Sequence, residues 1–248
     1  MDMMKLALIL LILLPSFTFA QVNIEEIRGK AKEGFSGKAD VGFDLQSGNT
    51  ETISYRGSTR VDYASGYHHY FLQLAIDRSE TPQALVKDNA FAHLRWTAMW
   101  WGSLGTDLFV QSQYDFFKDL TLRQLEGGYL RLVFPVTSGQ IAFGVGGMSE
   151  YELLKEGKGD GFTLRMTNYI SLTEVLSKKR IKFDLTAYYQ PKFEDFSDYR
   201  LTLVSQLNIT VVGQLSVLPS LNYAYDSSPP SGVRVDDSST RVSLRYSW

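Results

Sequence analysis

The chain ends on the stretch Arg241-Val242-Ser243-Leu244-Arg245-Tyr246-Ser247-Trp248, in which polar and apolar side chains alternate strictly. Because successive side chains of a β-strand point to opposite faces, this alternation predicts a strand with one apolar and one polar face. The edge strand of a soluble sandwich alternates as well, but it rarely stops on its aromatic residue. The stretch therefore favours a strand whose apolar face lies against lipid.

The same period of two residues recurs upstream, from Phe35 onward. Leu72, Leu74 and Ile76, for example, share one face of their segment, and Gln73 and Asp77 share the other. We expect about twelve such strands of roughly ten residues each, which is the pattern of a transmembrane β-barrel. Residues 35–248 contain no linker, so they are expected to form one domain.

The connections between these strands fall into two classes. Every second connection is short, and the others are longer and more polar. Short periplasmic turns and longer outer loops are the asymmetry of outer-membrane barrels, and aromatic residues gather near both expected strand ends. The predicted fold is therefore all-β, a single closed antiparallel transmembrane barrel of about 12 strands. The short connections lie at Ser65-Gly66, Trp101-Gly102, Ser138-Gly139, Lys178-Lys179 and Val212-Gly213.

The first twenty residues have the pattern of a cleaved signal peptide. A short charged start is followed by an apolar run from Leu6 to Leu14, and Ala20 precedes the expected cleavage site. A buried N-terminal helix is the alternative, but the run is too short to cross a bilayer, which takes about 20 residues. We expect residues 1–20 to direct export to the outer membrane of a Gram-negative cell and residues 21–34 to form a periplasmic lead-in.

Composition excludes several classes of function. The chain has no cysteine, which excludes a lipoprotein anchor, a disulfide framework and a thiolate metal site. Its net charge of −2 gives no basic field for nucleic acid. No metal or cofactor is expected.

Charged side chains recur on the polar face of the expected strands, which in a barrel is the lumen. Such charges are tolerated in a lumen when they pair with one another or with water. One interpretation is a narrow aqueous pore with walls of mixed sign, and the other is a plug of salt bridges that closes the barrel. The candidates are Arg56, Arg60, Asp62, Arg95, Asp107, Arg131, Arg165 and Asp184.

Catalysis is not expected. A lipid-modifying enzyme would need a serine and a histidine on the lipid-facing rim, and the chain has only His68, His69 and His93. His68 and His69 lie beside a predicted periplasmic turn, and His93 is expected to face the lumen. No Gly-x-Ser-x-Gly segment is present. A lipid-modifying enzyme is therefore the weakest of three alternatives, after a pore and a closed barrel that acts through its outer loops.

Two strands depart from the pattern. Glu126 falls on the apolar face with Leu130 and Leu132, and we expect Gly127-Gly128 to hold a β-bulge that shifts the register. Pro219 lies inside a strand pattern, where it removes a ladder hydrogen bond, and predicts a bend or a different strand boundary.

Two segments resemble a known family. Phe35-Ser36-Gly37, Val41-Gly42-Phe43 and the turn Ser47-Gly48-Asn49-Thr50 resemble the opening of domain-of-unknown-function family 481, whose members carry the label salt-induced outer membrane protein. The alternating end with Val242, Leu244, Tyr246 and Trp248 is similar to the C-terminal signal for barrel insertion. The resemblance covers nearly the whole mature chain and implies an outer-membrane barrel without an assigned reaction.

The partners expected from this interpretation are those of the envelope. They are outer-membrane lipid, lipopolysaccharide and, during insertion, the barrel-assembly machinery. Acidic outer loops, with Asp160, Glu194 and Asp236 among their residues, either bind divalent cations that bridge lipopolysaccharide or form a solvated face.

Overall fold

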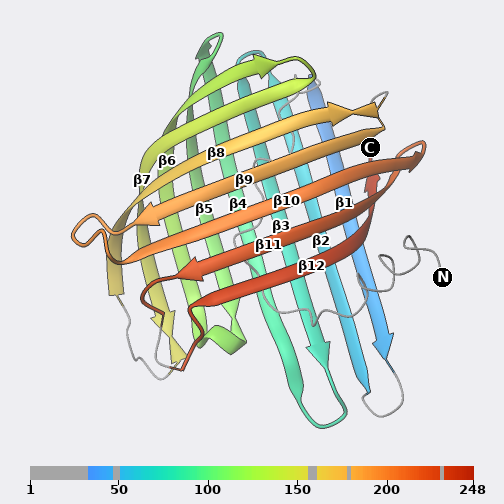
Figure 1. Cartoon of the computed structure of the whole chain (residues 1–248), viewed down its shortest axis with the longest axis vertical. Helices are drawn as coiled ribbons and strands as arrows, with labels where there is room; N and C mark the ends of the chain where they lie inside the picture. Colours follow the sequence, from blue (N-terminus) through green and yellow to red (C-terminus); the bar gives the residue numbers. More distant parts are fainter. Residues whose placement is uncertain (1–32, 47–50, 156–160, 178–179, 230–231) are drawn as a thin grey trace, which may run out of the picture.

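The computed structural model describes residues 33–46, 51–155, 161–177, 180–229 and 232–248. In these residues twelve antiparallel strands close into one barrel, each hydrogen-bonded to its neighbours in chain order (Figure 1). The predicted fold class is confirmed. The strands are β1 (Gly34–Gln46), β2 (Thr52–Ser65), β3 (His68–Glu80), β4 (Leu85–Trp101), β5 (Leu104–Asp115), β6 (Leu120–Val136), β7 (Gly139–Leu154), β8 (Gly161–Leu176), β9 (Ile181–Pro191), β10 (Tyr199–Val212), β11 (Leu215–Asp226) and β12 (Asp236–Ser247).

The predicted signal peptide and residues 21–32 of the lead-in lie outside the described residues. In the described part of the chain, no helix is long and apolar enough to cross a membrane.

The outward face of the barrel is apolar. On β3, Leu72, Leu74 and Ile76 are exposed, whereas Phe71 and Asp77 on the alternate positions are buried. Exposed Leu, Ile, Val and aromatic side chains recur on every strand around the barrel. Soluble proteins rarely expose an apolar surface of this extent, so the outward face is suited to lipid.

The two ends of the barrel differ. Tight turns close one end, which we call the inner end, and Gly66, Gly102 and Gly213 take positive φ angles of 56°, 49° and 53° there. Glycine adopts this left-handed region without the steric cost that a Cβ would add. The other end, which we call the outer end, carries the longer connections, including the 3-10 turn η1 (Phe116–Lys118) between β5 and β6.

The predicted bulge at Gly127-Gly128 is wrong. The register of β6 with β5 and with β7 runs unbroken through both glycines, and Glu126 points outward and is exposed. The glycines make room instead: a Cβ on Gly127 would lie 2.9 Å from the ring of Phe109. The strand therefore keeps its parity and places an acidic residue on the apolar face.

Pro219 neither ends nor shifts its strand. β11 continues through Pro219, which pairs with Val242 of β12 in an unbroken register. On the β10 side, pairing lapses between Gln206–Ser220 and Ile209–Val217 and resumes in the same register. Because proline has no backbone N–H to donate, a lost ladder contact opposite Pro219 is expected. This lapse in pairing is the whole effect of the proline on its strand.

Candidate functional site

The inward face of the barrel is the candidate site, and large side chains fill it unevenly. Six strands, β3 to β6 with β8 and β9, each project one aromatic ring into the lumen, and each ring is buried to 8% exposure or less. We call these rings the aromatic layer. Its members are Phe71, Phe91, Phe109, Tyr129, Tyr169 and Tyr188.

His93 of β4 lies within this layer. Its ring stacks at centroid distances of 5.4 Å on Phe71, 6.0 Å on Phe91 and 5.7 Å on Phe109. Its Nδ1 lies 2.8 Å from Gln111 Oε1, in hydrogen-bonding contact. The predicted lumenal position of His93 is therefore occupied by a packed ring rather than by a free base. The layer continues around the wall from Phe109 to Tyr129 (5.4 Å), Tyr169 (5.1 Å) and Tyr188 (5.8 Å).

Arginines stack on the rings of the aromatic layer. The guanidinium of Arg60 lies 3.7 Å from the ring centroid of Phe71, and that of Arg95 lies 5.3 Å from Tyr129. Such cation–π contacts are strongest where water is excluded, and both arginines are at most 2% exposed. The layer is thus a rigid packing of rings and cations.

Asp107 joins two of these cations. Its Oδ2 lies 3.6 Å from Arg95 Nη1 and 3.7 Å from Arg131 Nη1, and Thr97 Oγ1 donates a hydrogen bond of 2.6 Å to Oδ1. Arg131 in turn donates to the hydroxyl of Tyr169 at 2.5 Å. A fully buried carboxylate requires such partners, because an isolated charge there is costly.

The other predicted lumenal charges also lie on the inward face. Arg60 donates to Asp62 at 2.9 Å, and His69 Nε2 lies 2.8 Å from the same carboxylate. Asp184 accepts from Thr173 at 2.7 Å, and Arg165 lies 2.9 Å from Asp198. Arg56 lies opposite Asp77 across the β2–β3 pair. The four residues of the predicted C-terminal insertion signal lie outward and are 50–56% exposed: Val242, Leu244, Tyr246 and Trp248.

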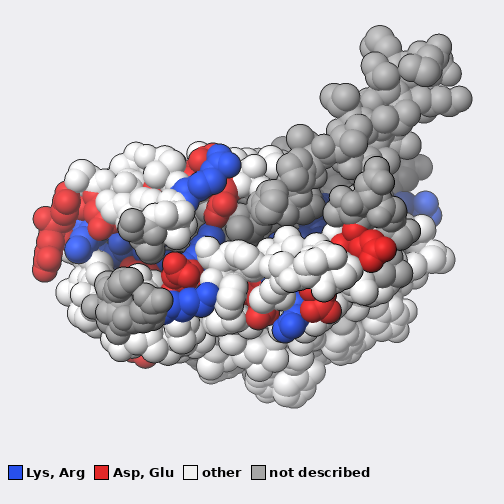
Figure 2. Space-filling model, turned by 90° about the horizontal axis from the view of Figure 1, so that it is seen from below, with Lys and Arg blue, Asp and Glu red and all other residues white. Residues whose placement is uncertain are grey.

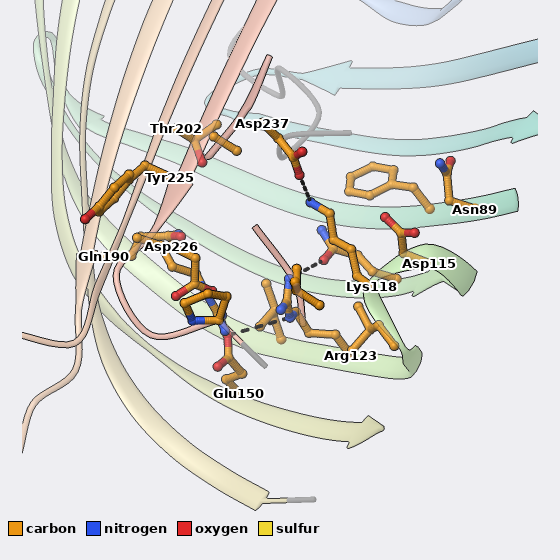
Figure 3. A pocket seen from close by; sticks show the side chains of 18 of the residues that line it. Asn89, Asp115, Lys118, Arg123, Glu150, Gln190, Thr202, Tyr225, Asp226 and Asp237 are labelled. Carbon is orange, nitrogen blue, oxygen red and sulfur yellow. Dashed lines mark hydrogen bonds and ion pairs between the residues drawn. The ribbon is translucent and has the colours of Figure 1, made fainter. Parts of the chain in front are cut away.

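A cavity of about 120 Å³ occupies the outer end of the lumen. We call it the outer vestibule. Charged side chains of both signs gather around this mouth (Figure 2). In the vestibule Lys118 of η1 and Asp237 of β12 point toward each other and form an ion pair of 2.8 Å (Figure 3). Since η1 and β12 lie on different sides of the mouth, this pair bridges it.

Glu150 of β7 forms the centre of an ion-pair network below the mouth. Arg200 reaches it from β10 and also contacts Asp226 at 2.8 Å, while Arg165 lies 3.3 Å away. Arg123 lies 4.0 Å from the same carboxylate (Figure 3). Three cations around one carboxylate tie β6, β7, β8 and β10 together.

The remaining wall of the lumen is lined by small polar side chains. We call this the polar wall; it comprises the partly exposed inward positions of β10, β11, β12 and β2. Other inward positions on these strands are buried, among them Thr202, Leu218 and Arg245. Inward positions on β3 to β9 are mostly buried. Space in the lumen therefore lies along this side. Its residues include Ser54, Ser58, Gln206, Ser220, Asn222 and Ser243.

The aromatic layer is the part of the site that our sequence analysis missed. A signal was present, since Phe91, Phe109 and Tyr129 occupy the same strand parity as His93, Asp107 and Arg131. An aromatic residue on the polar parity predicts a filled lumen rather than a lipid contact. Among the described residues, no group of three or more His, Cys, Asp or Glu side chains is arranged to hold a metal ion.

Comparisons with known proteins agree with this geometry. The family described as "Protein of unknown function, DUF481" matches residues 39–248. No curated protein matches the chain. Among solved structures, a NanC porin shares 7% identity with a TM-score of 0.51, covering 85% of this chain and 98% of that one.

Two further structures align less closely. A KdgM porin has a TM-score of 0.45 at 10% identity, over 86% of this chain and 99% of that one. The translocator domain of the autotransporter NalP from Neisseria meningitidis has a TM-score of 0.44 at 13% identity, over 88% and 89%. At such identities the similarity to the NanC porin shows a shared barrel fold.

Proposed function

The chain belongs to this DUF481 family, which carries no assigned activity, and we propose that it is a non-enzymatic barrel of the bacterial outer membrane with a narrow passage for ions and small polar solutes. The apolar outward face and the predicted signal peptide support this location. The proposal concerns the passage, because the barrel itself is common to proteins with many roles.

The observation that supports this proposal most strongly is the uneven filling of the lumen. The aromatic layer occupies one side, and the partly exposed serine, asparagine and glutamine side chains of the polar wall line the other. A 12-stranded barrel lies between small barrels filled by side chains and wide porins of 16 or more strands. A half-filled lumen of this size leaves a passage that hydrated ions enter and larger solutes do not.

The test uses single cysteines, which the natural chain lacks. We expect a bulky water-soluble thiol reagent to reduce the single-channel current of Ser243→Cys, because that position lies on the polar wall. Thr186→Cys is the matched control, since Thr186 also points inward but is fully buried. Equal sensitivity of the two variants, or none in Ser243→Cys, would place the passage elsewhere.

A closed barrel acting through its outer loops is the second candidate. The Lys118–Asp237 pair across the mouth favours it, because a bridge there obstructs entry to the outer vestibule. Lys118→Gln removes the pair while leaving the wall of the lumen intact. If the bridge closes the mouth, this variant conducts and the natural protein is silent; if the passage is already open, both conduct.

A further inference from the structure

The basic side chains that line the outer vestibule are already paired with carboxylates. Lys118 lies 2.8 Å from Asp237. Arg200 contacts Asp226 at 2.8 Å and Glu150 as well. An anionic ligand would have to displace a carboxylate from one of these cations, and a cationic ligand would have to displace a cation.

The two remaining basic residues of the lining are engaged too. Arg123 donates to Glu152 and, at 3.3 Å, to the side-chain oxygen of Gln113. Arg234 lies 3.5 Å from Asp236. The described lining of the vestibule contains four basic and four acidic residues in all. This balance favours a ligand without net charge.

Several neutral polar side chains of the same cavity have unused hydrogen-bonding groups. Asn89 of β4 and Thr202 of β10 are both buried, and within the described part of the chain their side chains form no hydrogen bond. Gln111 of β5 uses its Oε1 on the ring of His93, at 2.8 Å, while its Nε2 has no partner among the described residues. Such groups are costly in a buried position unless something else satisfies them.

Two further residues present acceptors to the cavity. Gln190 of β9 donates through Nε2 to Thr167 at 3.1 Å, and its Oε1 accepts no hydrogen bond from the described residues. Asp115 of β5 is buried, and its Oδ1 accepts from the backbone N–H of Phe117 at 3.1 Å. Asp115 forms no ion pair with any described residue. Both residues are therefore suited to a ligand that brings hydrogen-bond donors.

These groups face one another across the cavity. Figure 3 shows Asn89 and Asp115 on one side and Gln190 and Thr202 on the other. The first two belong to β4 and β5 and the last two to β9 and β10, which are not neighbours in the barrel. A ligand between them can hydrogen-bond to both walls at once.

Apolar side chains complete the lining. The buried ring of Phe91 lies in the cavity wall together with the buried side chains of Leu120 and Leu125. Ligand sites commonly combine such apolar surface with a few placed polar groups. The volume of about 120 Å³ limits the ligand to a small molecule.

We propose that the outer vestibule binds a small, uncharged, polyhydroxylated solute of the monosaccharide class. Its hydroxyls hydrogen-bond to Asn89 and Asp115 on one wall and to Gln190 and Thr202 on the other, and its C–H groups pack on Phe91. A hydroxyl both donates and accepts, so it satisfies amide and carboxylate groups without displacing an ion pair. Binding here requires access from the outer end but no conduction, so the inference goes beyond the proposed passage.

Binding is tested by a saturation-transfer NMR titration of the folded barrel in detergent micelles. The probes are glucose and galactose, each compared with its uronate and with its amino sugar, which keep the ring and add a negative or a positive charge. We expect at least one neutral sugar to bind, and to bind at least about fivefold more tightly than both of its charged analogues, because a charged group finds no unpaired partner of opposite sign except Asp115.

Two substitutions locate the site. Asn89→Leu and Thr202→Val remove a hydrogen-bonding group from opposite walls at nearly unchanged size. Each should weaken binding about twofold to tenfold, as the loss of one hydrogen bond predicts. Asn168→Leu is the matched control, because Asn168 lies on the outward face of β8, away from the cavity. A heat-modifiable band on a gel confirms that each variant is folded.

Three results would overturn the assignment. One is the absence of binding by both neutral sugars. Another is tighter binding of a uronate or an amino sugar, which would make the site ionic. The third is unchanged binding in both Asn89→Leu and Thr202→Val, which would place the ligand elsewhere. The titration measures no current, so a failure of binding leaves the passage standing, and a silent channel leaves the binding site standing.

Discussion

Replacing Asp107 by asparagine should destabilise the barrel strongly, because Arg95 and Arg131 both face this fully buried carboxylate. Asparagine keeps the size of the side chain and still accepts the hydrogen bond from Thr97. The substitution therefore removes the charge and little else. Breaking a buried ion pair by removing one partner costs about 3–5 kcal/mol.

The geometry places the expected cost at the lower end of that range. The two nitrogen–oxygen distances, 3.6 and 3.7 Å, are longer than those of a charge-assisted hydrogen bond, about 2.7–2.9 Å. We expect a loss of about 3 kcal/mol in the free energy of unfolding, which is roughly a 150-fold change in the folding equilibrium. Asp119→Asn is the control, since Asp119 is 57% exposed beside Lys155 and should change stability by about 0–1 kcal/mol.

The assay is urea unfolding of the barrel in lipid vesicles, followed by tryptophan fluorescence and by the heat-modifiable gel shift. A double-mutant cycle with Arg131→Gln separates the charge effect from general damage. Because Arg131→Gln removes one of the two cations left facing the site, the double variant should lose less than the sum of the single losses. A cost below about 1 kcal/mol for Asp107→Asn would refute the reasoning, since the buried cations would then not depend on this carboxylate.

Two further substitutions test the packing of the barrel. Leu244→Arg places a charge on the lipid face and should cost about 2–4 kcal/mol if it lies near the bilayer midplane. Ser243→Arg points into the lumen and should cost less, and equal losses of folded barrel in a refolding assay would argue against the assignment of faces. Gly144→Ala should cost about 1–3 kcal/mol, because its Cβ would lie 2.0 Å from the ring of Tyr169. Gly57→Ala is the control, with its nearest neighbouring atom 3.9 Å away, and urea unfolding that failed to separate the two variants would contradict the close packing.

Local periodicity was sufficient to predict the strands and their faces. A strand with one face in lipid alternates in sequence, so the parity of Arg95, Asp107 and Arg131 could be assigned without coordinates. The alternation of side chains along a strand does not show how closely the residues of that strand approach the neighbouring side chains. Glycine at position 127 therefore suggested a bulge, whereas it makes room for the ring of Phe109.

The pairing of charges was not predictable in the same way. Lys118 meets Asp237 across the mouth, and Arg241 of β12 meets Asp77 of β3. Each contact depends on the stagger between strands that are not neighbours in the chain, and period-two alternation contains no information on that stagger. The register of β1 against β12, which closes the barrel, was not predictable for the same reason.

The most direct test of the proposed passage is the single-channel conductance of the purified, heat-modifiable barrel in a planar bilayer at several salt concentrations. We expect small discrete current steps that grow with salt concentration and show modest ion selectivity, since charges of both signs line the lumen. A folded barrel that gives no current at any salt concentration would contradict the passage and would assign the protein to the closed alternative.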